Sequence, residues 1–240
     1  TGASNIAVGR RALNLNTTGT ENVALGTDAM YATTTSSRNT ALGHAALDAQ
    51  TDGSGYNTAV GNNALTANTS GTTNTAVGAN AGDALTTGSN NTSLGYEADS
   101  TAVDASNEFT LGNASVSALR CADTSIAALS DRRDKKDIID SSYGLEFINK
   151  IRPVQFTWDR RNLVKGDLES THNGKTRIGF ISQELQEAME DDSNEILDLV
   201  YESNPERLEV KQGKLIPILT KAVQELSAKV EELETKLNNK

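Results

Sequence analysis

The sequence predicts a mainly β N-terminal solenoid of seven 17-residue coils, followed by an α+β domain that ends in a coiled coil. A glycine-centred motif recurs at nearly constant intervals through the first half of the 240-residue chain. Every lysine and all three prolines lie after residue 129, so the composition changes there from a Gly, Ala, Asn, Thr and Ser mixture to a conventional one. Residues 216–237 carry aliphatic side chains at alternating spacings of three and four. We therefore expect two domains with different architectures.

The repeat in the first half has the pattern Asn-x-Ala-Val/Leu-Gly and weakens to NTSLG and NEFTLG in its last copies. Its glycines are Gly9, Gly26, Gly43, Gly61, Gly78, Gly95 and Gly112, spaced 17, 17, 18, 17, 17 and 17 residues apart. In the first four copies a second small–large pair, such as Ala29-Met30, follows the glycine. We predict two strands of about five residues per coil, positive φ at the glycine corner and an asparagine ladder along the axis.

A flexible low-complexity linker is the alternative interpretation of this composition, since Gly, Ser, Thr and Asn are typical of linkers. A linker needs neither constant intervals nor apolar residues in phase with them. The regular spacing therefore favours the solenoid.

Between the composition break and the terminal segment we expect a short helix, a β-hairpin and a second helix. In chain order these occupy residues 144–151, 154–158 with 177–181, and 183–190. Arg152-Pro153 ends the first helix. Asn173-Gly174 is a strong hairpin-turn signal, and Ser182 is positioned to cap the second helix.

The terminal segment is expected to form a coiled coil over residues 215–238. Its seam residues are Ile216, Leu219, Val223, Leu226, Val230, Leu233 and Leu237. A single amphipathic helix packed on its own domain is the alternative. Alternating Val and Leu along the seam favours a coiled coil of two helices by peptide rules. We expect three helices, because the preceding repeat resembles those of trimeric proteins.

Composition excludes several classes of function. The formal charge of −10 and the pI of about 4.7 argue against nucleic-acid binding, and no apolar run has the roughly 20 residues of a transmembrane helix. His44 and His172 lack neighbouring metal ligands, and no dinucleotide or P-loop motif occurs, so we expect neither metal nor cofactor. Only 4% of the residues are aromatic, and we expect partner chains to supply the missing burial.

The N-terminal repeats resemble those in the head domains of trimeric autotransporter adhesins and in the collar or shaft segments of viral fibres. Repeats of that kind fold as a parallel β-roll and assemble as trimers. The resemblance implies a β-roll and a homotrimer for residues 1–117.

Four segments of the second half, SDRRDKKDI, FINKIRPVQFTW, IGFISQELQEA and LEVKQGKLIPILTKAVQELSAKVEELETKL, occur in the order seen in another family. They resemble the C-terminal intramolecular chaperone domain, or peptidase S74 domain, of phage tail spikes and fibres. The resemblance covers residues 130–240 and leaves 118–129 as a linker. It implies that the domain trimerises, guides assembly of the fibre and then cuts itself off before the Ser of a Ser-Asp-x-x-x-Lys motif.

That motif maps onto Ser130, Asp131 and Lys135, and the implied scissile bond is Leu129–Ser130. A serine hydroxyl needs a base, and lysine serves only where burial or nearby cations favour its neutral form. Residues five apart lie about 140° apart on a helix and on opposite faces of a strand, so the pair can meet only across a turn or between chains. Asp134 occupies a position, just before the motif lysine, at which many members of the family have an apolar residue. Without the resemblance, this segment would be interpreted as a charged surface linker.

The leading hypothesis is a viral fibre segment carried with its self-cleaving trimerisation chaperone. It is expected in the virion after assembly in the host cytoplasm, with other tail proteins bound through a missing N-terminal part and a host glycan or protein as a further partner. The alternatives are a non-cleaving structural or adhesive fibre, a cellular trimeric adhesin, and a glycan-cleaving fibre enzyme.

Overall fold

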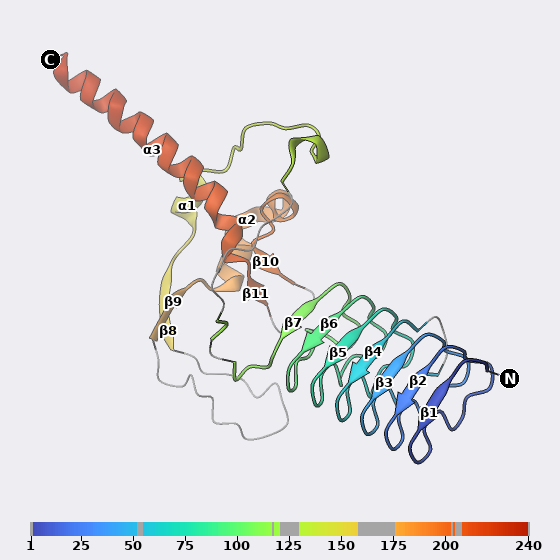
Figure 1. Ribbon diagram of the computed structural model, residues 1–240. Coiled ribbons are helices and arrows are strands. Elements are labelled where there is room, and N and C mark those ends of the chain that lie inside the picture. The colour runs from blue at the N-terminus through green and yellow to red at the C-terminus, as the bar shows by residue number, and fades with distance from the viewer. Residues whose placement is uncertain are drawn as a thin grey trace. The chain divides into compact units, whose positions relative to one another are not determined.

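The structure, a computed structural model, describes residues 2–51, 55–116, 118–120, 130–157, 176–202, 204 and 208–239. Within these ranges the side chains of residues 190–195 are not described. The chain divides into two compact units, Thr1–Leu119 and Arg120–Lys240 (Figure 1). The predicted domain boundaries at 117/118 and 129/130 stay predictions, because residues 117 and 121–129 lie outside the described part.

The N-terminal unit is a parallel β-solenoid, which confirms the predicted fold class. Its seven strands form one sheet in sequence order, one strand per repeat (Figure 1). They are β1 (Ile6–Val8), β2 (Val23–Leu25), β3 (Thr40–Leu42), β4 (Thr58–Val60), β5 (Thr75–Val77), β6 (Thr92–Leu94) and β7 (Phe109–Leu111). Equivalent repeat positions are paired, as in Ala24 with Ala41 and Ala41 with Ala59. The spacing of the motif thus sets the register of the sheet.

The prediction of two strands of about five residues per coil is wrong. Each coil has one three-residue strand, and the second apolar segment is a turn in which alternate residues have positive φ, for example Asp28 at 60° and Met30 at 52°. Alternating signs of φ exclude an extended strand. The turn still bonds to both neighbouring coils, because Asp28 N–H donates to Arg10 O and Met30 N–H donates to Ala46 O.

Small and aliphatic side chains fill the solenoid interior. The strand alanines and the large residue of each turn are almost completely buried, among them Ala24, Ala41, Ala59, Ala76, Met30, Leu47 and Leu65. No aromatic side chain belongs to the buried core among the described residues of this unit. A core this thin relies on hydrogen bonds between coils as well as on apolar burial.

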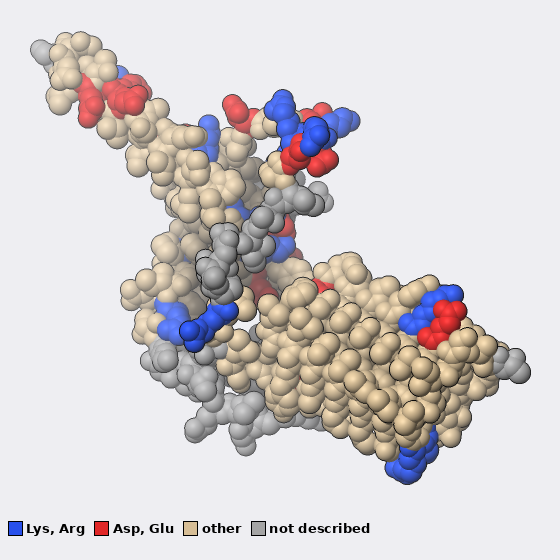
Figure 2. All heavy atoms as spheres, viewed as in Figure 1, with Lys and Arg blue, Asp and Glu red and all other residues tan. Residues whose placement is uncertain are grey.

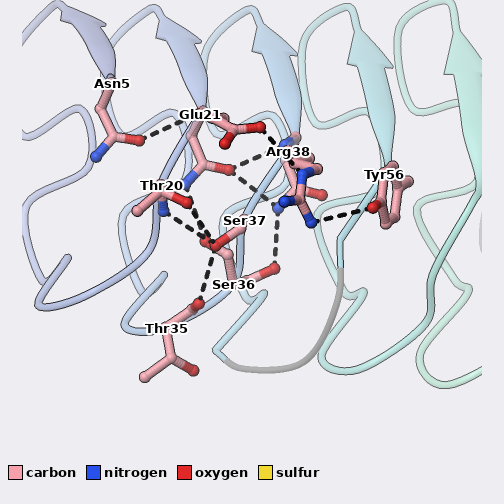
Figure 3. Close-up of polar contacts among 10 residues, drawn as sticks. Asn5, Thr20, Glu21, Thr35, Ser36, Ser37, Arg38 and Tyr56 are labelled. Carbon is pink, nitrogen blue, oxygen red and sulfur yellow. Dashed lines mark hydrogen bonds and ion pairs between the residues drawn. The ribbon is translucent and has the colours of Figure 1, made fainter. Parts of the chain in front are cut away.

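The expected asparagine ladder is present and uses the main chain. Asn22 N–H donates to Asn5 Oδ1, and Asn39 N–H donates to Asn22 Oδ1, each at 2.9 Å (Figure 3). The same bond recurs at Asn57, Asn74 and Asn91, with lengths of 2.9 to 3.0 Å. Each buried asparagine therefore satisfies an amide of the next coil.

The ladder ends where the motif changes to NEFTLG. Glu108 takes the asparagine position, and its N–H donates to Asn91 Oδ1 at 2.9 Å. Its carboxylate turns back within the coil and accepts hydrogen bonds from Thr101 N–H and Thr101 Oγ1. The weakened repeat in the sequence thus marks the last rung.

Surface side chains also link successive coils. Arg38 forms an ion pair with Glu21 of the preceding coil, with Nε 3.0 Å from Oε2. Its Nη1 donates to Tyr56 Oη of the following coil at 3.0 Å (Figure 3). One arginine therefore bridges three coils.

Asp99 places a carboxylate in the row of positions that lies four residues after each repeating glycine. Leu13, Met30, Leu47 and Leu65 occupy this row, followed by Gly82 and Asp99. Burial, together with the carboxylate of Asp83, raises the pKa of Asp99 to about 6, and Glu97 adds negative charge near Asp83. Because this pKa lies above that of the unfolded chain, the folded solenoid retains the proton to higher pH, and its stability falls as pH rises from about 4 through 6.

We expect Asp99→Asn to raise the melting temperature at pH 7.5 and to flatten its decline between pH 5 and 7.5, because the neutral amide removes a partly buried charge. Thermal unfolding followed by circular dichroism at several pH values measures this. Asp104→Asn, at an exposed carboxylate of the same coil, is the matched control and should leave the decline in place. An Asp99→Asn profile parallel to that of the unmodified chain would contradict the assignment.

The C-terminal unit is α+β, as predicted. Its elements are η1 (Arg132–Asp134), α1 (Leu145–Lys150), β8 (Val154–Thr157), β9 (Thr176–Gly179), α2 (Ser182–Leu197), β10 (Val200–Tyr201), β11 (Glu209–Val210), η2 (Gln212–Lys214) and α3 (Leu215–Asn238). The strands form two antiparallel pairs, β8 with β9 and β10 with β11. Phe147, Leu185, Met189, Leu199 and Ile218 are among the residues of its core.

The predicted elements of this unit are largely confirmed. The short helix, the hairpin strands and the terminal helix lie where expected, while α2 is longer than predicted and begins at Ser182 itself. Asn173-Gly174, the predicted hairpin turn, lies outside the described residues. The coiled coil stays a prediction, because the structure contains one chain.

Candidate active site

A single turn brings the two predicted catalytic residues together. Asp131 caps the 3-10 helix η1, and its carboxylate accepts a hydrogen bond from Arg133 N–H at 2.8 Å. Asp134 N–H donates to Asp131 O, and Lys135 N–H donates to Arg132 O, each at 3.2 Å. The chain therefore reverses between residues 131 and 135.

The reversal places Lys135 Nζ 2.6 Å from Ser130 Oγ, with the ammonium donating the hydrogen bond. Residues five apart were expected to meet either across a turn or between chains, and in the structure they meet across a turn within one chain. A hydroxyl and an amine at this distance can exchange a proton directly. Leu129, on the other side of the predicted scissile bond, lies outside the described residues.

Asp131 is also held by the side chain of Arg133. Arg133 Nε donates to Asp131 Oδ1 at 3.0 Å, and Nη2 donates to Oδ2 at 2.6 Å. Hydrogen bonds from the guanidinium, and then from the Arg133 amide, lower the pKa of Asp131 below its usual value. The capping carboxylate is therefore ionised at neutral pH.

Two of the three cations that are close to Lys135 in sequence lie near carboxylates. Arg133 is paired with Asp131, and Lys136 Nζ lies 4.0 Å from the carboxylate of Asp137. Among the described residues, neither Arg132 nor the carboxylate of Asp134 takes part in an ion pair. Ser130, Lys135 and their neighbours are exposed, and in Figure 2 charges of both signs gather around η1 while the visible face of the solenoid is mostly uncharged.

The predicted seam of α3 lies on a different face from the one that packs on its own domain. Leu215, Ile218 and Ala222 are buried. The seven seam residues from Ile216 to Leu237 are 46% to 73% exposed. Burial within the domain therefore does not explain the seam, whose side chains stay exposed along α3.

The sequence did not reveal two residues that organise this unit. Glu225 Oε2, on α3, accepts a hydrogen bond from Leu145 N–H at 2.8 Å and so caps α1 from 80 positions away. Such a long-range cap leaves no local signal. Arg133 had a local one, because an Asp-x-Arg spacing at a capping position allows the bidentate ion pair.

No group of three or more potential metal ligands is found within the described residues. His44 Nδ1 lies 3.3 Å from Asn62 Nδ2 on the next coil, and His172 lies outside the described part. Across the described helices, none is long and apolar enough to cross a membrane.

Residues 130–193 match the family model described as chaperone of endosialidase, peptidase S74. The match begins at Ser130, the residue expected to follow the cut, and includes η1, α1, the β8–β9 hairpin and most of α2. It ends before β10, β11 and α3, so the resemblance expected over residues 130–240 is confirmed for residues 130–193. No match was found among curated proteins or among solved structures.

Proposed function

We propose that the chain is a segment of a viral tail fibre or spike that carries a self-cleaving intramolecular chaperone. The supporting observation is that the family match begins at Ser130, whose Oγ lies 2.6 Å from Lys135 Nζ, in the unit that follows the β-solenoid in the chain. The chaperone guides assembly of the solenoid and is then released by cleavage of the Leu129–Ser130 bond. The fibre belongs to a virion assembled in the host cytoplasm.

The reaction uses Ser130 as nucleophile and Lys135 as base. Neutral Lys135 accepts the hydroxyl proton of Ser130 while Oγ attacks the Leu129 carbonyl carbon, and the proton passes to the departing Ser130 nitrogen. The product is an ester between Leu129 and Ser130 Oγ, with a free amine on Ser130. Water then hydrolyses the ester, leaving a carboxylate on Leu129 and restoring the Ser130 hydroxyl.

Assembly gates this chemistry. Ser130 and Lys135 are both exposed in the single chain, whereas a lysine base needs a water-poor or cationic environment. Neighbouring chains supply that environment in the assembled state, so cleavage follows trimerisation.

The proposed assembly is a homotrimer that uses two apolar surfaces. One is the α3 seam. The other runs along the outside of the sheet, where the third residue of each strand is exposed or half-buried: Val8, Leu25, Leu42, Val60, Val77, Leu94 and Leu111. Exposed apolar surfaces of this extent are typical of interaction sites. Tail proteins and a host-surface glycan or protein are the further partners.

We expect Leu226→Lys to convert the trimer into monomer or aggregate, because it places three charges together in the seam. Light scattering at micromolar concentration measures the change. The matched control is Ala228→Lys, which adds the same charge on the opposite side of α3. A monomeric unmodified chain, or an unaffected Leu226→Lys trimer, would reject the coiled coil.

The mass and N-terminal sequence of the purified chain test the proposed function as a whole. Cleavage predicts pieces spanning residues 1–129 and 130–240, the second starting with Ser-Asp-Arg-Arg. A chain that stays full-length over days as a trimer would instead support a purely structural or adhesive fibre.

A further inference from the structure

We propose that Arg133 is a positioning residue for self-cleavage: its side chain locks the Asp131 cap, and the locked turn holds Lys135 against Ser130. This inference rests on the proposed self-cleavage and adds a residue to it. Arg133 does not touch the reacting atoms.

The same residue engages Asp131 twice. The Arg133 amide donates to Asp131 Oδ1 at 2.8 Å, and its guanidinium donates to both carboxylate oxygens. The amide bond alone forms the cap, but the carboxylate of an exposed aspartate can leave a single donor by rotation of its side chain. The bidentate pair fixes the carboxylate in the capping orientation.

The cap determines where Lys135 lies. In an extended chain, residues 130 and 135 point to opposite faces, whereas η1 turns the chain so that Lys135 returns to Ser130. Ser130 and Lys135 are each exposed, so little packing holds them in place. The turn, and therefore its cap, provides the constraint that keeps the amine within bonding distance.

Arginine suits this role better than lysine. Its planar fork presents two donors to the two carboxylate oxygens, while an ammonium offers a point charge without fixed direction. Arg132, next in the chain and on the same turn, forms no ion pair with any described residue and is the matched control. Because the Arg133–Asp131 ion pair is exposed, its loss should have a modest effect. We expect cleavage to become roughly fivefold slower when the pair is removed.

The experiment compares the first-order cleavage rates of the unmodified chain, Arg133→Gln, Arg133→Lys and Arg132→Gln at low and high salt. We expect Arg133→Gln to be slow and insensitive to salt, since the screened ion pair is already gone. Arg133→Lys recovers part of the rate, and Arg132→Gln behaves as the unmodified chain. A general folding defect would not remove the salt dependence.

A second readout is independent of cleavage. Mild acetylation followed by peptide mass spectrometry gives the labelling of Lys135 relative to Lys136, its exposed neighbour. We expect Arg133→Gln, and not Arg132→Gln, to shift this ratio as Lys135 leaves Ser130. An unchanged ratio overturns the positioning role whether or not the chain cleaves. Failure of the unmodified chain to cleave while the ratio shifts instead overturns the proposed self-cleavage alone.

Discussion

Ser130→Ala and Lys135→Ala are each expected to leave a full-length chain with the assembly state of the unmodified protein. The first removes the proposed nucleophile, and the second removes the proposed base, which lies 2.6 Å from it. Loss of either member of a nucleophile–base pair disables the same step, so each variant should cleave at least about 10³-fold more slowly. Gel analysis with mass determination over days provides the measurement.

Matched controls separate the dyad from its surroundings. Ser142→Ala and Lys136→Ala remove an exposed serine and an exposed lysine nearby, and both should cleave at the normal rate. Cleavage that persists in Ser130→Ala would point to a contaminating protease and remove the enzyme assignment. An unmodified chain that does not cut would favour the non-cleaving fibre and implicate Asp134, and Asp134→Leu should then restore cleavage.

The solenoid could be predicted from the sequence because the motif recurs at a nearly constant interval. Its apolar residues keep the same position in every repeat, and a glycine recurs at every corner. The length of the strands could not be predicted. Met30 and its equivalents adopt positive φ, which β and helix preferences do not anticipate for large side chains. Hydrogen bonds to both neighbouring coils stabilise these turns, so the deciding interactions lie 17 residues away in the chain.

The proposed Ser130–Lys135 pair could be identified only through the family resemblance, because SDRRDKKD has the composition of a charged surface segment. The spacing of five residues allowed the pair to meet across a turn or between chains, and the structure has a turn that Asp131 caps. The sequence also did not show which residues of α3 are buried against its own domain. The seam pattern is visible in the sequence, whereas the packing of Leu215, Ile218 and Ala222 depends on residues as distant as Phe147.

Gly61→Ala is expected to break the solenoid near its middle. Gly61 has φ of +141°, and a Cβ there would lie 2.2 Å from Gly78 O and 2.6 Å from Gly78 C. The obstructing atoms are backbone atoms of the next corner glycine, which is stacked in turn on Gly95, where the corresponding distance is 2.3 Å. No side-chain rotation relieves the clash, so the two coils must separate.

Strain at such a φ alone costs about 1–3 kcal/mol, and separation of two coils also removes inter-coil hydrogen bonds. We expect a loss of about 3 kcal/mol or more, which for a unit of this size lowers the melting temperature by on the order of 10 °C. Because each coil contacts only its neighbours, the solenoid should melt in two steps on either side of the fourth corner. Gly213→Ala, whose Cβ would meet nothing within 4 Å, should melt as the unmodified chain does. Thermal unfolding followed by circular dichroism distinguishes them, and a Gly61→Ala transition within about 2 °C of the original would show that the corners are not close-packed.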